Sequence, residues 1–503
     1  MGFSFDSLFR PQQQQKVVEE QPPSSNAVTA AATTPATTQI SLKNTTPSAN
    51  VYVTVTGLDT SRNNARWLLQ SDGATGYWPA SPGDDHAALA ADCSIALGGP
   101  GSSRTVAVPH LAGARIYFSR DRPLHFELNR GGPGGGAALV EPSITNAADA
   151  NYGVAWDFCE FTYDDRQLFV NITYVDFVSI PTALQLESET PGAAVQRVAG
   201  IRAGGLDDIC ARLQDQQARD GAGWGSLVVK APAGGGGGGN LRALSPNSGM
   251  VLQPGLFAGY YEPYVDAVWA KYRSADLRVD TQGSWGVVTG RVGGGSAGGE
   301  DTLDFPGVGS FPRPSTRDVF SCDTGAFARY AANGDEMGNI TARLAAALNR
   351  STLLLNGDQP DGERAETFYP PGGVTNHYAR ILHAASVDGR GYAFPYDDVG
   401  AEGAPDQAGT VFDGAPKLLT VYIGGFDDGG SAAVEAAAQG AAKAEVAEAA
   451  TANVVKKEEE RSGGDGEEEG GGRLKARLAS VRGSVRRVLS RRLGPGRRAQ
   501  KVA

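Results

Sequence analysis

Two acidic residues occupy an unusual setting between residues 156 and 178, WDFCEFTYDDRQLFVNITYVDFV. Glu160 and Asp176 each lie within a run of aromatic and β-branched residues. An acid among apolar neighbours is costly to ionise, so Asp and Glu normally occupy turns unless the charge or the proton is used. The pair therefore suggests general acid and base chemistry. Solvent-facing acids on half-buried strands would give the same pattern, and the pattern alone leaves both interpretations open.

The elements around this pair are predicted to be mostly strands. The 503 residues include 68 Gly and 28 Pro, and short alternating runs separated by turns extend over residues 51–186, which is typical of a β-barrel or sandwich. The period then changes: Leu206, Ile209 and Leu213 recur on one helical face, and helices alternate with strands over residues 192–352. We expect a mixed α/β lobe inserted before the last strands, with a wide groove between the two parts.

Several longer motifs resemble glycoside hydrolase family 64. They follow in order over roughly residues 48–426 and include GARIYFS at 113–119, LVEPSITN at 139–146, EFT and then YVDFV within 160–178, FPGVGSFPRPSTRDVFSCDTGAF at 305–327 and GYAFPYDD at 391–398. The resemblance implies a mainly β chain with a thaumatin-like barrel or sandwich. It also implies an inverting endo-β-1,3-glucanase that hydrolyses laminarin- or curdlan-type glucan to short oligosaccharides. The alternative is a non-catalytic β-1,3-glucan-binding thaumatin-like protein.

The resemblance matches Glu160 to the acid and Asp176 to the base of the family. Glu160, between apolar neighbours, is also the better candidate for the raised pKa that an acid needs. If residues 156–178 formed one tight hairpin, the two carboxylates would lie about 20 Å apart along the strand. An inverting pair is separated by roughly 6.5–9.5 Å. We therefore expect residues 162–174 to make a longer excursion, without a simple two-residue turn at Asp165.

Five further residues are predicted to bind substrate. Thr162 shares the strand parity of Glu160, and Arg115 either binds sugar or orients Glu160, with a plain surface role equally open. Asp397 and Asp398 follow the thaumatin-like YPY pattern, although two Asp residues before Val-Gly are also typical of a turn. Trp156 is one of several possible stacking platforms for sugar rings, most tryptophans being core residues.

The predicted boundaries follow the composition. They are a disordered segment over 1–48, the first part of the barrel over 49–191, the α/β lobe over 192–352, the last part of the barrel over 353–426 and a low-complexity tail over 427–503.

The charge of the tail differs from that of the remaining chain. Residues 473–501 hold eleven basic residues and no acidic one, which leaves 34 basic and 56 acidic residues elsewhere. The body should therefore repel nucleic acid, whereas the tail permits a basic amphipathic helix on a membrane or another polyanion. A disordered tail that contacts the acidic body fits equally well. The predicted partner of the body is β-1,3-glucan, and we expect a monomer.

No metal and no organic cofactor is predicted. The five histidines lack HExxH spacing, the four cysteines lack CxxC spacing, and the hexaglycine over 234–239 lacks the phosphate-binding lysine. The first residues show neither a basic start nor an apolar segment of a secretory signal. The resemblance nevertheless implies a location outside the cell or in a cell wall.

Overall fold

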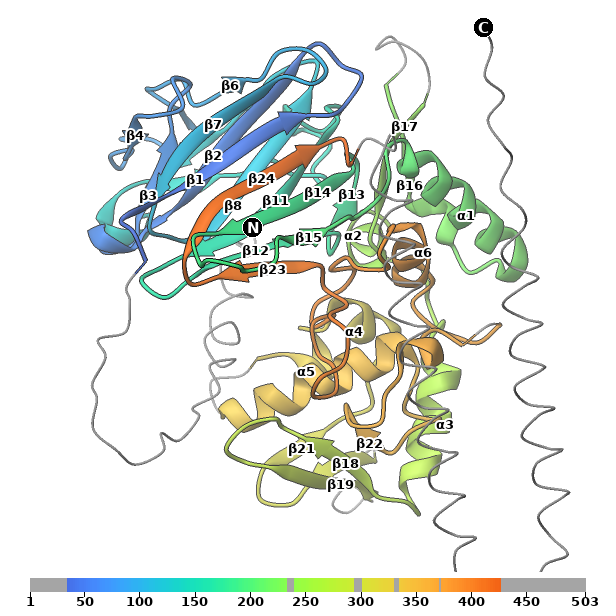
Figure 1. Cartoon of the computed structure of the whole chain (residues 1–503). Coiled ribbons are helices and arrows are strands. Elements are labelled where there is room, and N and C mark those ends of the chain that lie inside the picture. Colours follow the sequence, from blue (N-terminus) through green and yellow to red (C-terminus); the bar gives the residue numbers. More distant parts are fainter. Residues whose placement is uncertain (1–33, 233–238, 294–300, 330–333, 371, 427–503) are drawn as a thin grey trace, which may run out of the picture. The chain divides into compact units, whose positions relative to one another are not determined.

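Two packed β-sheets form the framework of the chain (Figure 1). The structure, a computed structural model, describes residues 34–232, 239–293, 301–329, 334–370 and 372–426. The first sheet has the order β15-β14-β24-β1-β7. Its strands are β1 (Thr37–Asn44), β7 (Ser103–Pro109), β14 (Thr182–Ser188), β15 (Gln196–Val198) and β24 (Pro416–Ile423).

The second sheet carries the candidate site and has the order β23-β12-β11-β8-β2-β3-β4, with β6 beside β2. Its strands are β2 (Val51–Asp59), β3 (Ala65–Leu69), β4 (Gly76–Tyr77), β6 (Ile95–Ala96), β8 (Leu111–Arg120), β11 (Trp156–Tyr163), β12 (Leu168–Ile172) and β23 (Thr410–Asp413). Alternate residues of both sheets meet in one hydrophobic core, for example Leu42 and Val421 from the first and Ile116 and Phe161 from the second. Because alternate side chains of a strand point to opposite faces, the other face is left for polar groups.

The predicted mainly β framework is confirmed. Both sheets have free ends, so among the described residues they form an open sandwich and no closed barrel.

The predicted disordered segment over 1–48 ends too late. β1 pairs with β24 and β7, and its residues Ile40 and Leu42 are completely buried. The two apolar residues alternate with polar ones in TTQISLKN, a strand pattern that the surrounding Thr- and Ala-rich composition obscured. The remainder of the predicted segment, residues 1–33, lies outside the described residues.

The α/β lobe contains all the longer helices among the described residues. They are α1 (Gly205–Asp220), α2 (Pro246–Leu252), α3 (Glu262–Tyr272), α4 (Thr316–Ser321), α5 (Asp335–Arg350) and α6 (His377–Ala385). Leu206, Ile209 and Leu213 are buried on one face of α1, as the periodicity predicts. α5 is buried on nearly every side, which its small alanine side chains permit. None of the helices that the structure describes is long and apolar enough to cross a membrane.

Three smaller sheets complete the chain. The order β21-β20-β19-β18-β22 comprises β18 (Leu277–Asp280), β19 (Val287–Gly293), β20 (Thr302–Phe305), β21 (Gly309–Phe311) and β22 (Asp358–Gln359). The order β13-β17-β16 comprises β13 (Phe177–Val178), β16 (Val228–Lys230) and β17 (Asn240–Leu244), and the order β10-β9-β5 comprises β5 (Ala87–Ala88), β9 (Glu127–Asn129) and β10 (Ala138–Val140).

These pairings correct the predicted boundary at residue 353. β22 pairs with β18 of the lobe, and α6 packs against α1, so residues 358–385 belong with the lobe. In the described chain after them, only β23 and β24 return to the two large sheets. The lobe therefore continues well beyond its predicted end, because strand pairing between distant segments leaves no mark in local composition.

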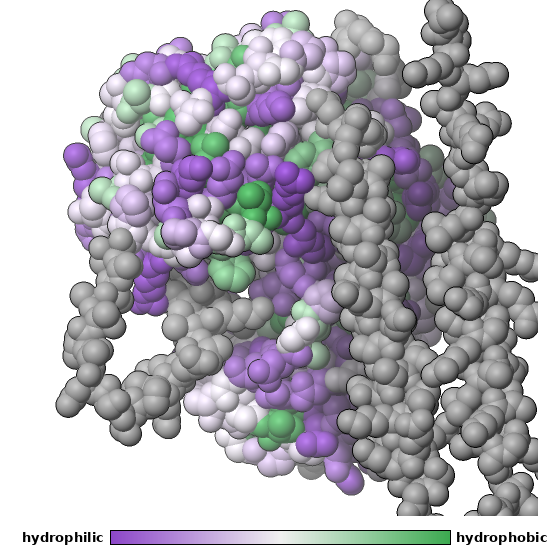
Figure 2. Space-filling model, viewed as in Figure 1, coloured by the Kyte–Doolittle hydropathy of each residue, from purple (hydrophilic) through white to green (hydrophobic). Residues whose placement is uncertain are grey.

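The surface shown in Figure 2 is mixed in polarity, and the cysteines form no disulfide. On the face seen in Figure 2, hydrophobic residues form small separate patches between hydrophilic ones. All four cysteines are buried and free, so hydrophobic packing, and no disulfide, holds the two sheets together.

Candidate active site

A row of polar side chains crosses the outer face of the second sheet. Arg115 on β8 is paired with Glu160 on β11, Glu160 with Asn171 on β12, and Asn171 with Thr410 on β23. Residues directly opposite each other on neighbouring strands project to the same face. The four side chains therefore lie side by side above the sheet, and all four line one pocket.

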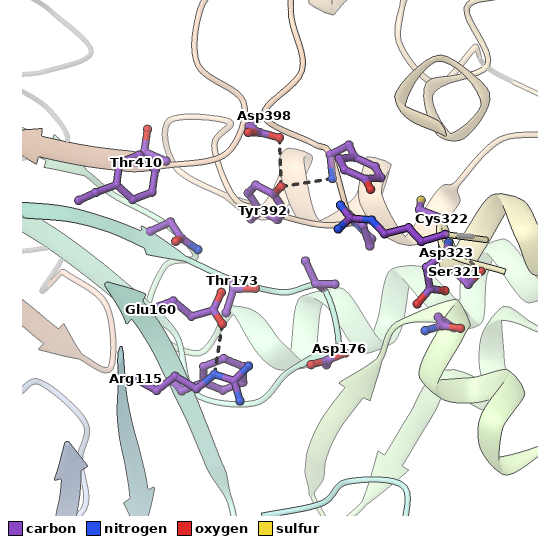
Figure 3. Close-up of a pocket in the computed structure, with 18 residues that line it drawn as sticks. Arg115, Glu160, Thr173, Asp176, Ser321, Cys322, Asp323, Tyr392, Asp398 and Thr410 are labelled. Carbon is purple, nitrogen blue, oxygen red and sulfur yellow. Dashed lines mark hydrogen bonds and ion pairs between the residues drawn. The ribbon is translucent and has the colours of Figure 1, made fainter. Parts of the chain in front are cut away.

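The pocket is bounded by the second sheet, by the chain after β12, by the end of α4 and by residues 392–398 (Figure 3). Its other lining residues are Phe158, Phe169, Thr173, Val175, Asp176, Asn247, Ser321, Cys322, Asp323, Arg329, Tyr392, Pro395, Tyr396 and Asp398. Figure 3 shows Glu160 and Asp176 on one side of the pocket and Tyr392 and Asp398 on the other. The structure thus brings both predicted acids into one pocket.

Arg115 holds two carboxylates beside the pocket. Its Nε donates to Glu160 Oε1 at 3.2 Å, and its Nη1 donates to Glu141 Oε2 at 2.8 Å and to the Tyr117 hydroxyl at 3.2 Å. The guanidinium of Arg115 also lies over the ring of Phe158, 4.9 Å from the ring centre. This contact and the hydrogen bonds together hold the guanidinium in one orientation. Of the two predicted roles, the contacts favour orientation of Glu160.

The chain brings Asp176 to Glu160 by a route that differs from the predicted one. Tyr163 on β11 pairs with Leu168 on β12, so a four-residue connection, and no two-residue turn, joins the strands. The expected long excursion over 162–174 is wrong, because β12 pairs directly with β11 from Leu168 onward. The chain instead leaves β12 after Ile172, forms a single bridge between Thr173 and Tyr392, and continues to β13 in another sheet. A calculation along one hairpin axis could not include this change of direction.

Asp157 ties this segment to the strand that carries Glu160. Its buried carboxylate accepts hydrogen bonds from the backbone N–H of Ser179 at 2.8 Å and of Ile180 at 3.1 Å. Between these points, Asp176 accepts a backbone hydrogen bond from Ser245 of the lobe at 2.9 Å. The position of Asp176 is therefore set by β11 on one side and by the lobe on the other.

The two acids differ in their electrostatic surroundings. Burial raises the pKa of Asp176 to about 6, with the charge of Glu160 adding to the rise and that of Arg115 opposing it. Among the described residues, no side chain donates a hydrogen bond to the Asp176 carboxylate. Glu160 has the guanidinium of Arg115 as a direct partner, 3.2 Å away. A raised pKa is therefore found at Asp176, the residue predicted to be the base.

Asp397 and Asp398 separate into different environments. Asp397 is completely buried, and its carboxylate contacts Arg350 at 3.1 Å, His383 at 2.9 Å and the backbone N–H of Ala393 at 3.0 Å. Asp398 lines the pocket and accepts a hydrogen bond from the Tyr392 hydroxyl at 3.0 Å. The predicted contact with substrate is therefore wrong for Asp397, because a buried ion pair already uses its oxygens.

Thr162 and Trp156 also occupy different places. Thr162 lies on the same sheet face as Glu160 but outside the pocket lining, beside Phe169 of the neighbouring strand. Trp156 has 2% of its surface exposed and packs against Phe177 with ring centres 4.7 Å apart. It is a core residue, and the predicted stacking platform at Trp156 is wrong.

Several residues in or beside the pocket were missed from sequence. Asn171 and Thr173 share the face of Glu160, and strand parity could have found Asn171. Glu141 lies in the LVEPSITN motif, but nothing local indicates its contact with Arg115. Asp323 comes from the end of α4, where burial raises its pKa above the ordinary value, and only the tertiary structure places it at the pocket.

Comparisons with known proteins place this geometry in a family. Residues 36–423 match the family model of glycoside hydrolase family 64, described as beta-1,3-glucanase. The chain is 30% identical over 399 residues to a glucan endo-1,3-beta-glucosidase of Cellulosimicrobium cellulans and likewise to one of Arthrobacter sp. (strain YCWD3). The match covers 78% of this chain and 66% of each relative, so the chain spans just under two thirds of their length.

Solved structures agree with this assignment. The crystal structure of a laminaripentaose-producing beta-1,3-glucanase in complex with laminaritetraose is 32% identical, covers 77% of this chain and 99% of that one, and superposes with a TM-score of 0.66. A beta-1,3-glucanase domain from Clostridium beijerinckii shares the fold at 20% identity and a TM-score of 0.57, over 77% of this chain and 98% of that domain. With its family model matched over most of its length, this chain belongs to glycoside hydrolase family 64, the family of the β-1,3-glucanases.

Proposed function

We propose that this chain is an endo-β-1,3-glucanase that hydrolyses internal glucan bonds with inversion and releases short oligosaccharides. The observation that carries the proposal is the pair of carboxyl groups, Glu160 and Asp176, which line one pocket in different electrostatic surroundings. Family membership and the relatives named as glucan endo-1,3-beta-glucosidases support the substrate class. The related glucanase whose structure holds laminaritetraose supports a β-1,3-linked chain as ligand.

An inverting glycosidase needs two concerted proton transfers. One carboxylic acid protonates the departing glycosidic oxygen while a carboxylate removes a proton from a water molecule, which attacks the anomeric carbon from the opposite face. The new reducing end then carries the α configuration. The open side of the pocket between the sheet and Asp398 is where the sugar and that water would lie.

The resemblance to the family gives Glu160 the acid role and Asp176 the base role. The raised pKa of Asp176 favours the reverse, because a carboxyl group that holds its proton near neutral pH is suited to the acid role. A β-laminarioligosyl fluoride distinguishes the two assignments, since fluoride departs without protonation. The variant that lacks the acid keeps hydrolysis of the fluoride, whereas the variant that lacks the base loses it.

Release of reducing ends from laminarin and curdlan tests the activity, and proton NMR of the first product tests the stereochemistry. We expect α product from the unsubstituted protein and little product from Glu160→Gln or Asp176→Asn. Tight binding of laminarin without release would instead favour the non-catalytic glucan-binding protein. An initial β product would give Asp176 the role of a nucleophile.

The finer assignments rest on the family alone. They are the thaumatin-like character of the sandwich and action outside the cell or in a cell wall. A monomeric state is a separate expectation. Sedimentation of the purified chain with and without laminarin measures the oligomeric state.

A further inference from the structure

Phe412 is an exposed aromatic residue on the edge strand beside the pocket. Among the strands that the structure describes, β23 lies at one end of the second sheet and pairs there with β12 alone. Phe412 has 54% of its surface exposed, whereas the next residue toward the pocket, Val411, is buried in the core. β23 therefore packs on the core with one face, and the large apolar side chain of Phe412 lies on its other, outer face.

The strand register places Phe412 next to the pocket. Phe412 pairs directly with Phe169, and Thr410 on the same strand pairs with Asn171. Phe169, Asn171 and Thr410 all line the pocket. Since paired residues share a face and alternate residues along a strand share a face, Phe412 projects to the side that carries Glu160.

A side-chain amide holds the backbone of Phe412. Gln196, at the start of β15 in the other sheet, donates from Nε2 to the carbonyl oxygen of Phe412 at 2.6 Å and accepts from its N–H at 3.1 Å. These are the two hydrogen bonds that a further strand would make. They satisfy the backbone N–H and C=O of Phe412 at the exposed edge of the sheet, which disfavours addition of a strand from another chain. They also show that the N–H and C=O of Phe412 point away from β12, so Phe169 and Phe412 form the closer, non-hydrogen-bonded type of pair.

Phe412 lies outward from the reacting groups. Two strand spacings and two residues along the strand separate it from Glu160, a distance of about 12 Å in the plane of the sheet. This exceeds the span of a single sugar unit at Glu160. Two neighbouring aromatic side chains, Phe169 at the pocket and Phe412 beyond it, thus form a path along the sheet.

From this arrangement we infer that Phe412 is the platform of an outer sugar-binding subsite, on which a β-1,3-glucan chain that leaves the pocket over Phe169 stacks a ring. The inference rests on the proposed function and extends it to substrate length. Sugar rings present C–H groups that pack on the negative face of an aromatic ring. A neutral ligand suits this position, because the face offers an aromatic surface with its backbone groups already bonded.

The test compares laminarioligosaccharides of increasing length in the full chain. Phe412→Ala should lower kcat/KM about 2- to 10-fold for chains long enough to reach the platform, the range for loss of one aromatic contact. Chains confined to the pocket should be hydrolysed as before. Phe412→Tyr should keep the preference for long chains and Phe412→Leu should lose it, because leucine retains apolarity without a ring. Leu355→Ala, which removes another exposed apolar side chain that does not line the pocket, serves as the matched control.

A direct binding measurement supplements the kinetics. In the Glu160→Gln background, Phe412→Ala should raise the Kd of a long oligosaccharide and leave that of a trisaccharide unchanged. An equal loss for all lengths, an unchanged length preference, or a changed oligomeric state of Phe412→Ala would overturn the platform. Absence of any hydrolysis by the unsubstituted chain would instead remove the proposed function, and the Kd comparison would then decide the platform alone.

Discussion

Replacing Asp397 and Asp398 one at a time provides a sharp test of the structure, because these adjacent residues are assigned opposite roles. Asp397→Asn removes the negative charge next to Arg350, whose side chain has no exposed surface. Breaking a buried ion pair by removing one partner costs about 3–5 kcal/mol. Glu363 stays 3.6 Å from the same guanidinium, and asparagine can still accept from the backbone of Ala393. We therefore expect a loss near the lower limit, about 3 kcal/mol in the free energy of unfolding.

Asp398→Asn is the matched control. Asp398 is exposed at the pocket, and surface substitutions usually change stability by less than about 0.5 kcal/mol. Its effect should appear in KM for laminarin. Urea unfolding followed by tryptophan fluorescence measures the free energy of unfolding of both variants. Initial rates of laminarin hydrolysis measure KM. A stable Asp397→Asn protein with a raised KM would refute the reasoning and return Asp397 to the substrate-binding residues.

The same buried group predicts a pH dependence of stability. Although burial opposes it, the charge of His383 together with that of Arg350 lowers the pKa of Asp397 below its ordinary value of 3.8. Burial lowers the pKa of His383, but the charge and hydrogen bond of Asp397 outweigh it and raise that pKa above 6.5. The Asp397 contribution is lost as pH falls through its lowered pKa, and the His383 contribution is lost as pH rises through its raised pKa. The pair should stabilise the fold most between these limits, and Asp397→Asn should flatten the dependence in urea unfolding at several pH values.

Five further predictions concern activity and binding. Glu160→Gln and Asp176→Asn should each lower kcat about 10²- to 10⁴-fold with the fold retained, since general acid and base contributions have that size; near-normal turnover on laminarin would exclude the residue concerned. The pH profile of kcat/KM should have a limb near pH 6 from Asp176, with activity falling below it if Asp176 is the base and above it if it is the acid. Arg115→Met should move that limb to higher pH, because the charge of Arg115 lowers the pKa of Asp176; an unmoved limb would assign it to another group. Asp157→Asn should lower kcat by about 10²-fold with little change in KM, since small misplacement of a reacting group has effects of that size; an equal change in both would indicate general loosening. Removal of residues 473–503, which lie outside the described residues, should leave laminarin hydrolysis unchanged and weaken binding to anionic vesicles or nucleic acid at low salt.

Much of the candidate site could be predicted from local sequence. The setting of Glu160 and Asp176 among apolar residues indicated a pair of carboxylates, and the parity of β11 placed Glu160 on the outer face of its sheet. The helical period of α1 and the alternation within the strands likewise depend on near neighbours only. Such features are set by residues a few positions apart, so they can be recognised before any tertiary structure is known.

The rest depended on contacts between distant segments. Asp397 and Asp398 are identical in type and adjacent in sequence, yet Arg350 of α5 selects one for the core and leaves the other at the pocket. Trp156 has the parity of Glu160 but is covered by Phe177. The neighbours of Phe412 are set by pairing between β12 and β23, more than two hundred residues apart. Burial, ion pairing and strand register are properties of the folded chain as a whole, and for that reason only the tertiary structure decides which of several chemically equal residues meets the substrate.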